Sequence, residues 1–164
     1  MFELDWTGGI IMRYYDLIEN ESKKGVTITE IPFKGQAKGY YCDSFIIINS
    51  KIDTETEKKC ILAEELGHHY TTSGNILDTK VVNSVKQENI ARKWASKKLI
   101  HVVDFIKAFE FGAKNRYEIA EYLEVTEEFL DQAIDYYKQR YGTYVEIDNY
   151  IIYFEPYFGV FKLL

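Results

Sequence analysis

The spacing of apolar and polar residues changes several times along the chain, and these changes predict strands near both ends. Residues 12–18 have helical spacing, and that helix is expected to end near Gly25, since glycine commonly follows a helix. Residues 26–31 are rich in β-branched side chains and predict a strand. Residues 40–49 predict one long strand or a hairpin pair. We therefore expect a small antiparallel sheet in this first third of the chain.

Helices are predicted for the middle of the chain. Thr54 is a good N-cap followed by acidic residues, which favour a helix start, and this helix is expected to run to about Tyr70. A polar connector over residues 71–79 precedes a second long helix over residues 83–100. A shorter apolar helix follows at residues 101–111.

The remaining pattern predicts two more helices and then strands. Residues 112–141 hold two helices that are broken near residues 124–126, and residues 144–164 alternate and are rich in aromatic side chains. This tail is typical of a terminal hairpin with a last strand after Pro156. Strands at both ends with helices between them predict the α+β class.

The composition predicts a single globular domain. The chain has 164 residues, of which 46% are hydrophobic, and this size suits one domain better than two. We expect residues 1–164 to form that domain, with a core at residues 25–111 and a helical pair with terminal strands at residues 112–164.

The net charge of −6 argues against binding to nucleic acid or to a membrane surface, because phosphate contacts need clustered Lys and Arg. No apolar run is long enough to span a bilayer, and no signal peptide is recognisable, so we expect a cytoplasmic protein. Cys42 and Cys60 lie far apart and are expected to be free thiols packed as small apolar residues.

One segment of the first long helix carries candidate chemistry. The run Ala63-Glu64-Glu65-Leu66-Gly67-His68-His69 differs by one residue from the His-Glu-x-x-His signature of zinc peptidases. Residues at positions i and i+4 lie about 40° apart around a helix, so both can reach one metal ion. Glu64 and His68 have this ligand spacing, and Glu65 has the position of a general base. The register of Glu65 and His69 would place Leu66 at the base position, which has no chemistry.

This segment resembles the ImmA/IrrE metallopeptidases, whose usual core is His-Glu-Leu-Gly-His. A second block agrees, because Glu88 is followed by Ala91, Trp94 and Ala95 as in the downstream helix of that family. The resemblance covers roughly residues 25–141 and implies a helical, zincin-like core. It also implies that Glu88 is the third metal ligand.

Glu64 departs from the family pattern, in which the first ligand is His. Carboxylates also bind zinc, so Glu64, His68 and Glu88 could still hold one divalent ion. With Glu65, three carboxylates would surround that ion, which weakens its Lewis acidity. Zinc is the expected metal, while oxygen-rich ligation would also suit manganese or iron.

Neighbouring residues have simpler interpretations. His69 points about 100° away from the ligand face, so a structural or substrate-side role is favoured, and Tyr70 is expected to be a packed aromatic. His101 stands among apolar residues and is expected to be buried, and Cys60 is expected in the core.

Residues 117–130 have the spacing of a helix-turn-helix, with Ala120, Leu123, Val125 and Leu130 as its core. The second helix carries mostly acidic side chains, which oppose binding to phosphates. Two packed helices closing the domain are therefore expected rather than a DNA-reading unit.

The resemblance implies a metal-dependent endopeptidase that hydrolyses a peptide bond through metal-activated water. It further implies a helix-turn-helix repressor as the protein substrate, as in an anti-repressor of a phage or mobile element. The alternative is a non-catalytic anti-repressor or toxin–antitoxin binding protein with the same fold. The presence of Glu64 in the first ligand position keeps this alternative open.

Overall fold

A computed structural model describes residues 11–72 and 81–164. Residues 73–79 of the predicted connector lie outside the described residues. The contacts within the chain divide it into two compact units, residues 12–98 and residues 99–164, and each is described by itself.

The first unit contains a three-stranded sheet and three helices. β3 lies in the centre of the sheet, where it pairs in parallel with β1 and antiparallel with β2. β2 is consequently an edge strand. The elements are α1 (Tyr14–Ser22), β1 (Thr27–Ile31), β2 (Gly39–Cys42), β3 (Phe45–Asn49), α2 (Glu55–Thr71) and α3 (Val81–Leu99).

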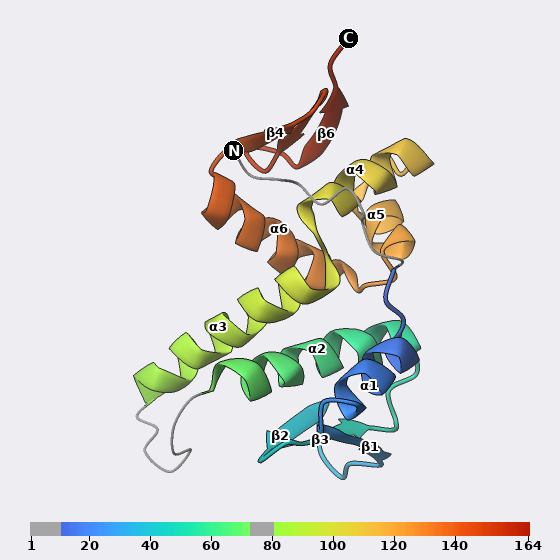
Figure 1. The fold of residues 1–164 in the computed structure, drawn as a ribbon, viewed down its shortest axis with the longest axis vertical. Coiled ribbons are helices and arrows are strands. Elements are labelled where there is room, and N and C mark those ends of the chain that lie inside the picture. Colours follow the sequence, from blue (N-terminus) through green and yellow to red (C-terminus); the bar gives the residue numbers. More distant parts are fainter. Residues whose placement is uncertain (1–10, 73–80) are drawn as a thin grey trace. The chain divides into compact units, whose positions relative to one another are not determined.

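Helices α1 and α2 both pack on the sheet (Figure 1), with α1 against β1 and α2 against β2 and β3. α2 begins where predicted, because the Thr54 side chain accepts a hydrogen bond from the backbone N–H of Glu57 at 3.2 Å. The core between helices and sheet consists of apolar side chains with no exposed surface: Leu17, Ile46, Ile48, Leu62 and Leu66.

The second unit consists of three helices and a second three-stranded sheet in the order β4-β5-β6, in which both pairings are antiparallel. Residues 117–130, which have the helix-turn-helix spacing, lie in two packed helices, and the four residues expected in their core are all buried. The elements are α4 (Val102–Phe111), α5 (Arg116–Tyr122), α6 (Glu127–Tyr141), β4 (Tyr144–Ile147), β5 (Tyr150–Tyr153) and β6 (Gly159–Lys162).

The α+β class is confirmed. Two details differ from the expectation. The first sheet is mixed rather than purely antiparallel. The strand order is β1-β3-β2, so β3 pairs in parallel with β1 on one side and forms a hairpin with β2 on the other. His101 is not buried: it is the N-cap of α4, a position that faces solvent, and its side chain is 61% exposed.

Neither cysteine is in a disulfide, but only Cys60 is buried. Cys42 ends the edge strand β2 and is exposed, so the expectation of apolar packing fails for it. Among the described helices, none has the length and apolar character needed to cross a membrane.

Candidate active site

Three of the four predicted site residues lie on α2, and together with His69 they form two stripes along the helix. Glu64 and His68 are four residues apart and share one stripe, while Glu65 and His69 form the next stripe about 100° around the axis. The two stripes contact different elements of the first unit.

The stripe of Glu64 and His68 faces α3. The Nε2 atom of His68 lies 3.1 Å from Oε2 of Glu88. The other oxygen of Glu88, Oε1, lies 3.0 Å from Nε of Arg92, one turn further along α3. Glu88 is therefore held between a histidine of one helix and an arginine of its own helix.

A glycine makes the close approach of these two helices possible. Gly67 is buried, and a Cβ atom placed on it would lie 2.3 Å from the carbonyl oxygen of Ala91. Ala91 is one turn after Glu88, and His68 directly follows Gly67. The contact between Gly67 and Ala91 therefore brings His68 and Glu88 within reach of each other.

The stripe of Glu65 and His69 faces the edge strand β2. A Cβ atom on Gly39 would lie 2.8 Å from Oε1 of Glu65, so a larger residue there would displace this carboxylate. Two residues along the strand, the hydroxyl of Tyr41 lies 3.3 Å from Nδ1 of His69. His69 thus belongs to the β2 side of the site rather than to the pair of His68 and Glu88.

Burial, together with the negative charges of Glu64 and Glu88, raises the pKa of Glu65 to about 7. Three carboxylates therefore act on one another in this small region. Ionisation of Glu65 would add a third negative charge beside the other two, which is why Glu65 holds its proton more tightly than an exposed carboxyl group.

A buried network supports the C-terminal end of α2. Glu21 of α1 has no exposed surface, and it accepts a hydrogen bond from the Tyr70 hydroxyl at 2.5 Å. The ammonium groups of Lys24 and Lys98 lie 2.9 and 3.3 Å from the same carboxylate. The ring of Tyr70 also stacks on Trp94 of α3, at 5.0 Å between centroids. This network joins α1, α2 and α3 directly behind the two histidines.

The fit of these side chains to a metal ion is incomplete. His68 and Glu88 are placed as two neighbouring donors, which suits an ion bound between α2 and α3. Within residues 11–72 and 81–164, however, no three His, Cys, Asp or Glu side chains are grouped as around one ion. The carboxylate of Glu64 is on the correct face of α2 but is not gathered with the other two.

Of the four predicted residues, the structure brings His68 and Glu88 into contact and places Glu65 beside Glu64. Sequence reasoning missed three neighbours, namely Gly39, Tyr41 and Arg92. The spacing of Glu88 and Arg92 is a recognisable i,i+4 ion pair, so the role of Arg92 could have been read from the sequence. The contacts of Gly39 and Tyr41 depend on how β2 lies against α2, for which the sequence holds no local signal.

The motif helix packed on a sheet, with an acidic residue facing it from the next helix, defines a metallopeptidase-type fold. The chain belongs to the ImmA/IrrE family: the family model described as IrrE N-terminal-like domain matches residues 21–135. This range includes all four predicted site residues. Comparisons with curated proteins and with solved structures give no match.

Proposed function

We propose that this protein is a metal-dependent endopeptidase in which Glu64, His68 and Glu88 hold one divalent ion and Glu65 is the general base. Membership of the ImmA/IrrE family supports the class of reaction. The assignment of these residues rests on the contact between His68 of α2 and Glu88 of α3. Glu65 directly follows Glu64 in α2, beside this contact.

Each residue of the chain has a distinct task in this proposal. A bound divalent ion would act as a Lewis acid, which polarises a carbonyl group and lowers the pKa of water. Glu65 orients the attacking water and accepts its proton on the carboxylate, which lies beside Gly39 of β2. Arg92 holds Glu88 through Oε1 and leaves Oε2 directed at His68. Binding of the ion requires the Glu64 side chain to turn toward that pair.

Zinc is the proposed metal, and two carboxylate ligands would also accept manganese or iron. The proposed substrate is a helix-turn-helix repressor, so that the protein acts as an anti-repressor of a phage or mobile element. This partner follows from what the family resemblance implies.

A second candidate function is a binding protein that uses the same fold without turnover, as an anti-repressor or a toxin–antitoxin component. Two observations favour it: Glu64 occupies the first ligand position, and the described side chains do not gather three donors around one point. In that case, His68, Glu88 and Arg92 form a structural link between α2 and α3.

Elemental analysis of the purified protein separates the two candidates. For the peptidase, we expect about one zinc, manganese or iron ion per chain. We expect its loss in Glu88→Ala and its retention in Glu19→Ala, where the altered carboxylate is exposed on α1 and pairs with Lys23. Absence of metal from the wild-type protein after incubation with each of these ions would favour the binding protein.

A further inference from the structure

Two cavities lie next to each other in the second unit, along the loop that joins α4 to α5. They have volumes of about 500 and 600 Å³, which is the size range of ligand pockets. Both are lined by Gly112, Ala113 and Lys114 of this loop and otherwise have different walls. We call them the aromatic cavity and the acidic cavity.

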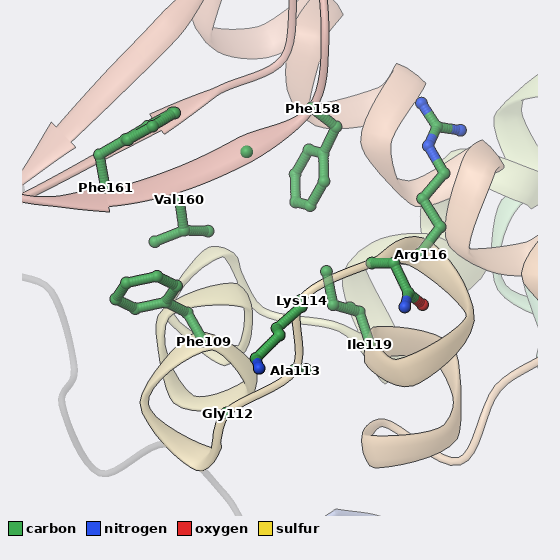
Figure 2. Close-up of a pocket in the computed structure, with 11 residues that line it drawn as sticks. Phe109, Gly112, Ala113, Lys114, Arg116, Ile119, Phe158, Val160 and Phe161 are labelled. Atoms are coloured by element: carbon green, nitrogen blue, oxygen red, sulfur yellow. The ribbon is translucent and has the colours of Figure 1, made fainter.

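The aromatic cavity is shown in Figure 2. Side chains of Phe109 and Ile119 form one side, and those of Phe158 and Val160 form the other, while the ring of Phe161 lies on the opposite face of β6. The wall is firm, because the ring of Phe158 packs edge-on against buried Phe105 at 5.0 Å between centroids. Residues 158–161 lie outside the range that the family model matches, so this wall is not part of the shared family core.

The acidic cavity combines aromatic rings with carboxylates. Phe111 is 77% exposed, and its ring lies 4.9 Å from that of Tyr122 between centroids. Three glutamates share the lining with a single cation, Lys114: they are Glu118, Glu121 and Glu124.

Two of these glutamates have no counter-charge among the residues that the structure describes. The carboxylate of Glu118 accepts a hydrogen bond from the backbone N–H of Lys114 at 2.6 Å. By contrast, no Lys or Arg among the described residues forms an ion pair with Glu121 or Glu124. An exposed phenylalanine beside two unpaired carboxylates suits a cationic side chain, which gains both from the charges and from the ring faces.

We propose that the α4–α5 loop docks a segment of a partner protein that carries an apolar side chain next to Arg or Lys. The apolar side chain enters the aromatic cavity, and the basic side chain enters the acidic cavity between Phe111, Glu121 and Glu124. Buried aromatic anchors and charge-assisted contacts are the groups that dominate binding energy in protein interfaces. This surface lies in the second unit and does not depend on the proposed peptidase site.

The test is selection of peptides from a displayed library of random 16-residue sequences, with the intact protein as bait. A random library covers every spacing between the two anchors. We expect selected sequences to combine Trp, Phe or Leu with Arg or Lys, and their binding to weaken as salt is added.

Variants then locate the binding surface. We expect selected peptides to lose at least about tenfold in affinity for Phe111→Ser, for Phe109→Ala and for Glu121→Gln combined with Glu124→Gln. The matched control is Asp135→Asn combined with Glu146→Gln, which removes two exposed acids of the same unit outside both cavities and should leave affinity unchanged. Phe111 is exposed and Phe109 is only half-buried, so these variants should fold, which circular dichroism checks.

Several results would overturn the proposal. These are failure to enrich any sequence, enrichment of acidic sequences, or equal binding to wild type and to the cavity variants. Self-association of the wild-type protein in sedimentation, abolished by Phe111→Ser, would assign the surface to a second copy of the chain instead.

Discussion

Gly67 of α2 and Ala91 of α3 touch through their backbones, and a methyl group on Gly67 would lie 2.3 Å from the carbonyl oxygen of Ala91. A glycine inside a helix costs about 1 kcal/mol relative to alanine. The close crossing of α2 and α3 accounts for this cost, because no other residue allows the two backbones to meet. The same crossing sets the distance between His68 and Glu88.

Gly67→Ala should therefore destabilise the protein, although alanine is the better helix former. Overpacking costs about 1 to 3 kcal/mol, and the gain in helix propensity offsets about 1 kcal/mol of it. We expect a net loss of roughly 1 to 2 kcal/mol in the free energy of unfolding, measured by urea denaturation. Because the helices must separate, the affinity for zinc should fall as well.

Gly35→Ala is the matched control. A Cβ atom on Gly35 meets nothing within 4 Å, so this substitution should be neutral or stabilise by less than about 1 kcal/mol. If Gly67→Ala proved as stable as Gly35→Ala, the crossing of α2 and α3 would not be limited by this contact.

The order of the elements could be predicted from the sequence because their signals are local. Thr54 caps α2 by its own hydroxyl, and Gly25 and Gly112 follow α1 and α4. The parallel pairing of β1 with β3 could not be predicted in this way. It depends on which side of β3 the strand β2 occupies, and no residue of β2 specifies that side by its own chemistry.

In the candidate site, too, the features that follow from local sequence were predictable and those that depend on packing between elements were not. The helical spacing placed Glu64 with His68 and Glu65 with His69, since that follows from helix geometry alone. The downstream position of Glu88 came from family resemblance, and its contact with His68 depends on how α3 crosses α2. Whether the Glu64 side chain turns toward that pair depends on its rotamer, which no spacing in the sequence determines.

Glu64→His should raise the affinity for zinc. The substitution provides the ligand usual for the family and removes one of the two negative charges, those of Glu64 and Glu88, that oppose ionisation of Glu65. Isothermal titration with zinc should show tighter binding for Glu64→His than for the wild type. The control Glu64→Gln removes the same charge without adding an imidazole, so an equal gain in both variants would assign the effect to charge alone. A folded Glu64→His variant with lower zinc affinity would contradict a ligand role for position 64.

Glu21 should make the stability of the protein depend on pH. Burial opposes ionisation of this carboxyl, but hydrogen bonds from Tyr70, Lys24 and Lys98 outweigh it and lower its pKa below 4.5. Its stabilisation is therefore fully present above pH 4.5 and is lost as the pH falls through the lowered value. Glu21→Gln should cost roughly 3 kcal/mol at pH 7, since it leaves the ammonium of Lys98 without its partner. The difference from the wild type should shrink below pH 4.5.

Glu19→Gln serves as the control for this measurement. Glu19 is on the same helix and pairs with Lys23 at 2.7 Å, but both side chains are 67% exposed. Exposed pairs of this kind contribute at most about 1 kcal/mol, so the variant should unfold like the wild type at every pH. A large pH-dependent loss in Glu19→Gln would show that net charge, rather than the buried network, controls stability in acid.

Glu65→Gln tests the proposed general base directly. Glutamine keeps the size of the side chain beside Gly39, so folding and zinc binding should be preserved. It cannot accept a proton from water, and loss of a general base typically slows a reaction by about 10²- to 10⁴-fold. Co-expression of a candidate helix-turn-helix repressor with the wild type and with Glu65→Gln should give a cleaved fragment only with the wild type. If both proteins cleave the repressor equally, the base is another residue and the register of the motif is wrong. If neither cleaves it but both bind it and relieve repression equally, the protein acts by binding, and the link between His68 and Glu88 serves only to hold α2 against α3.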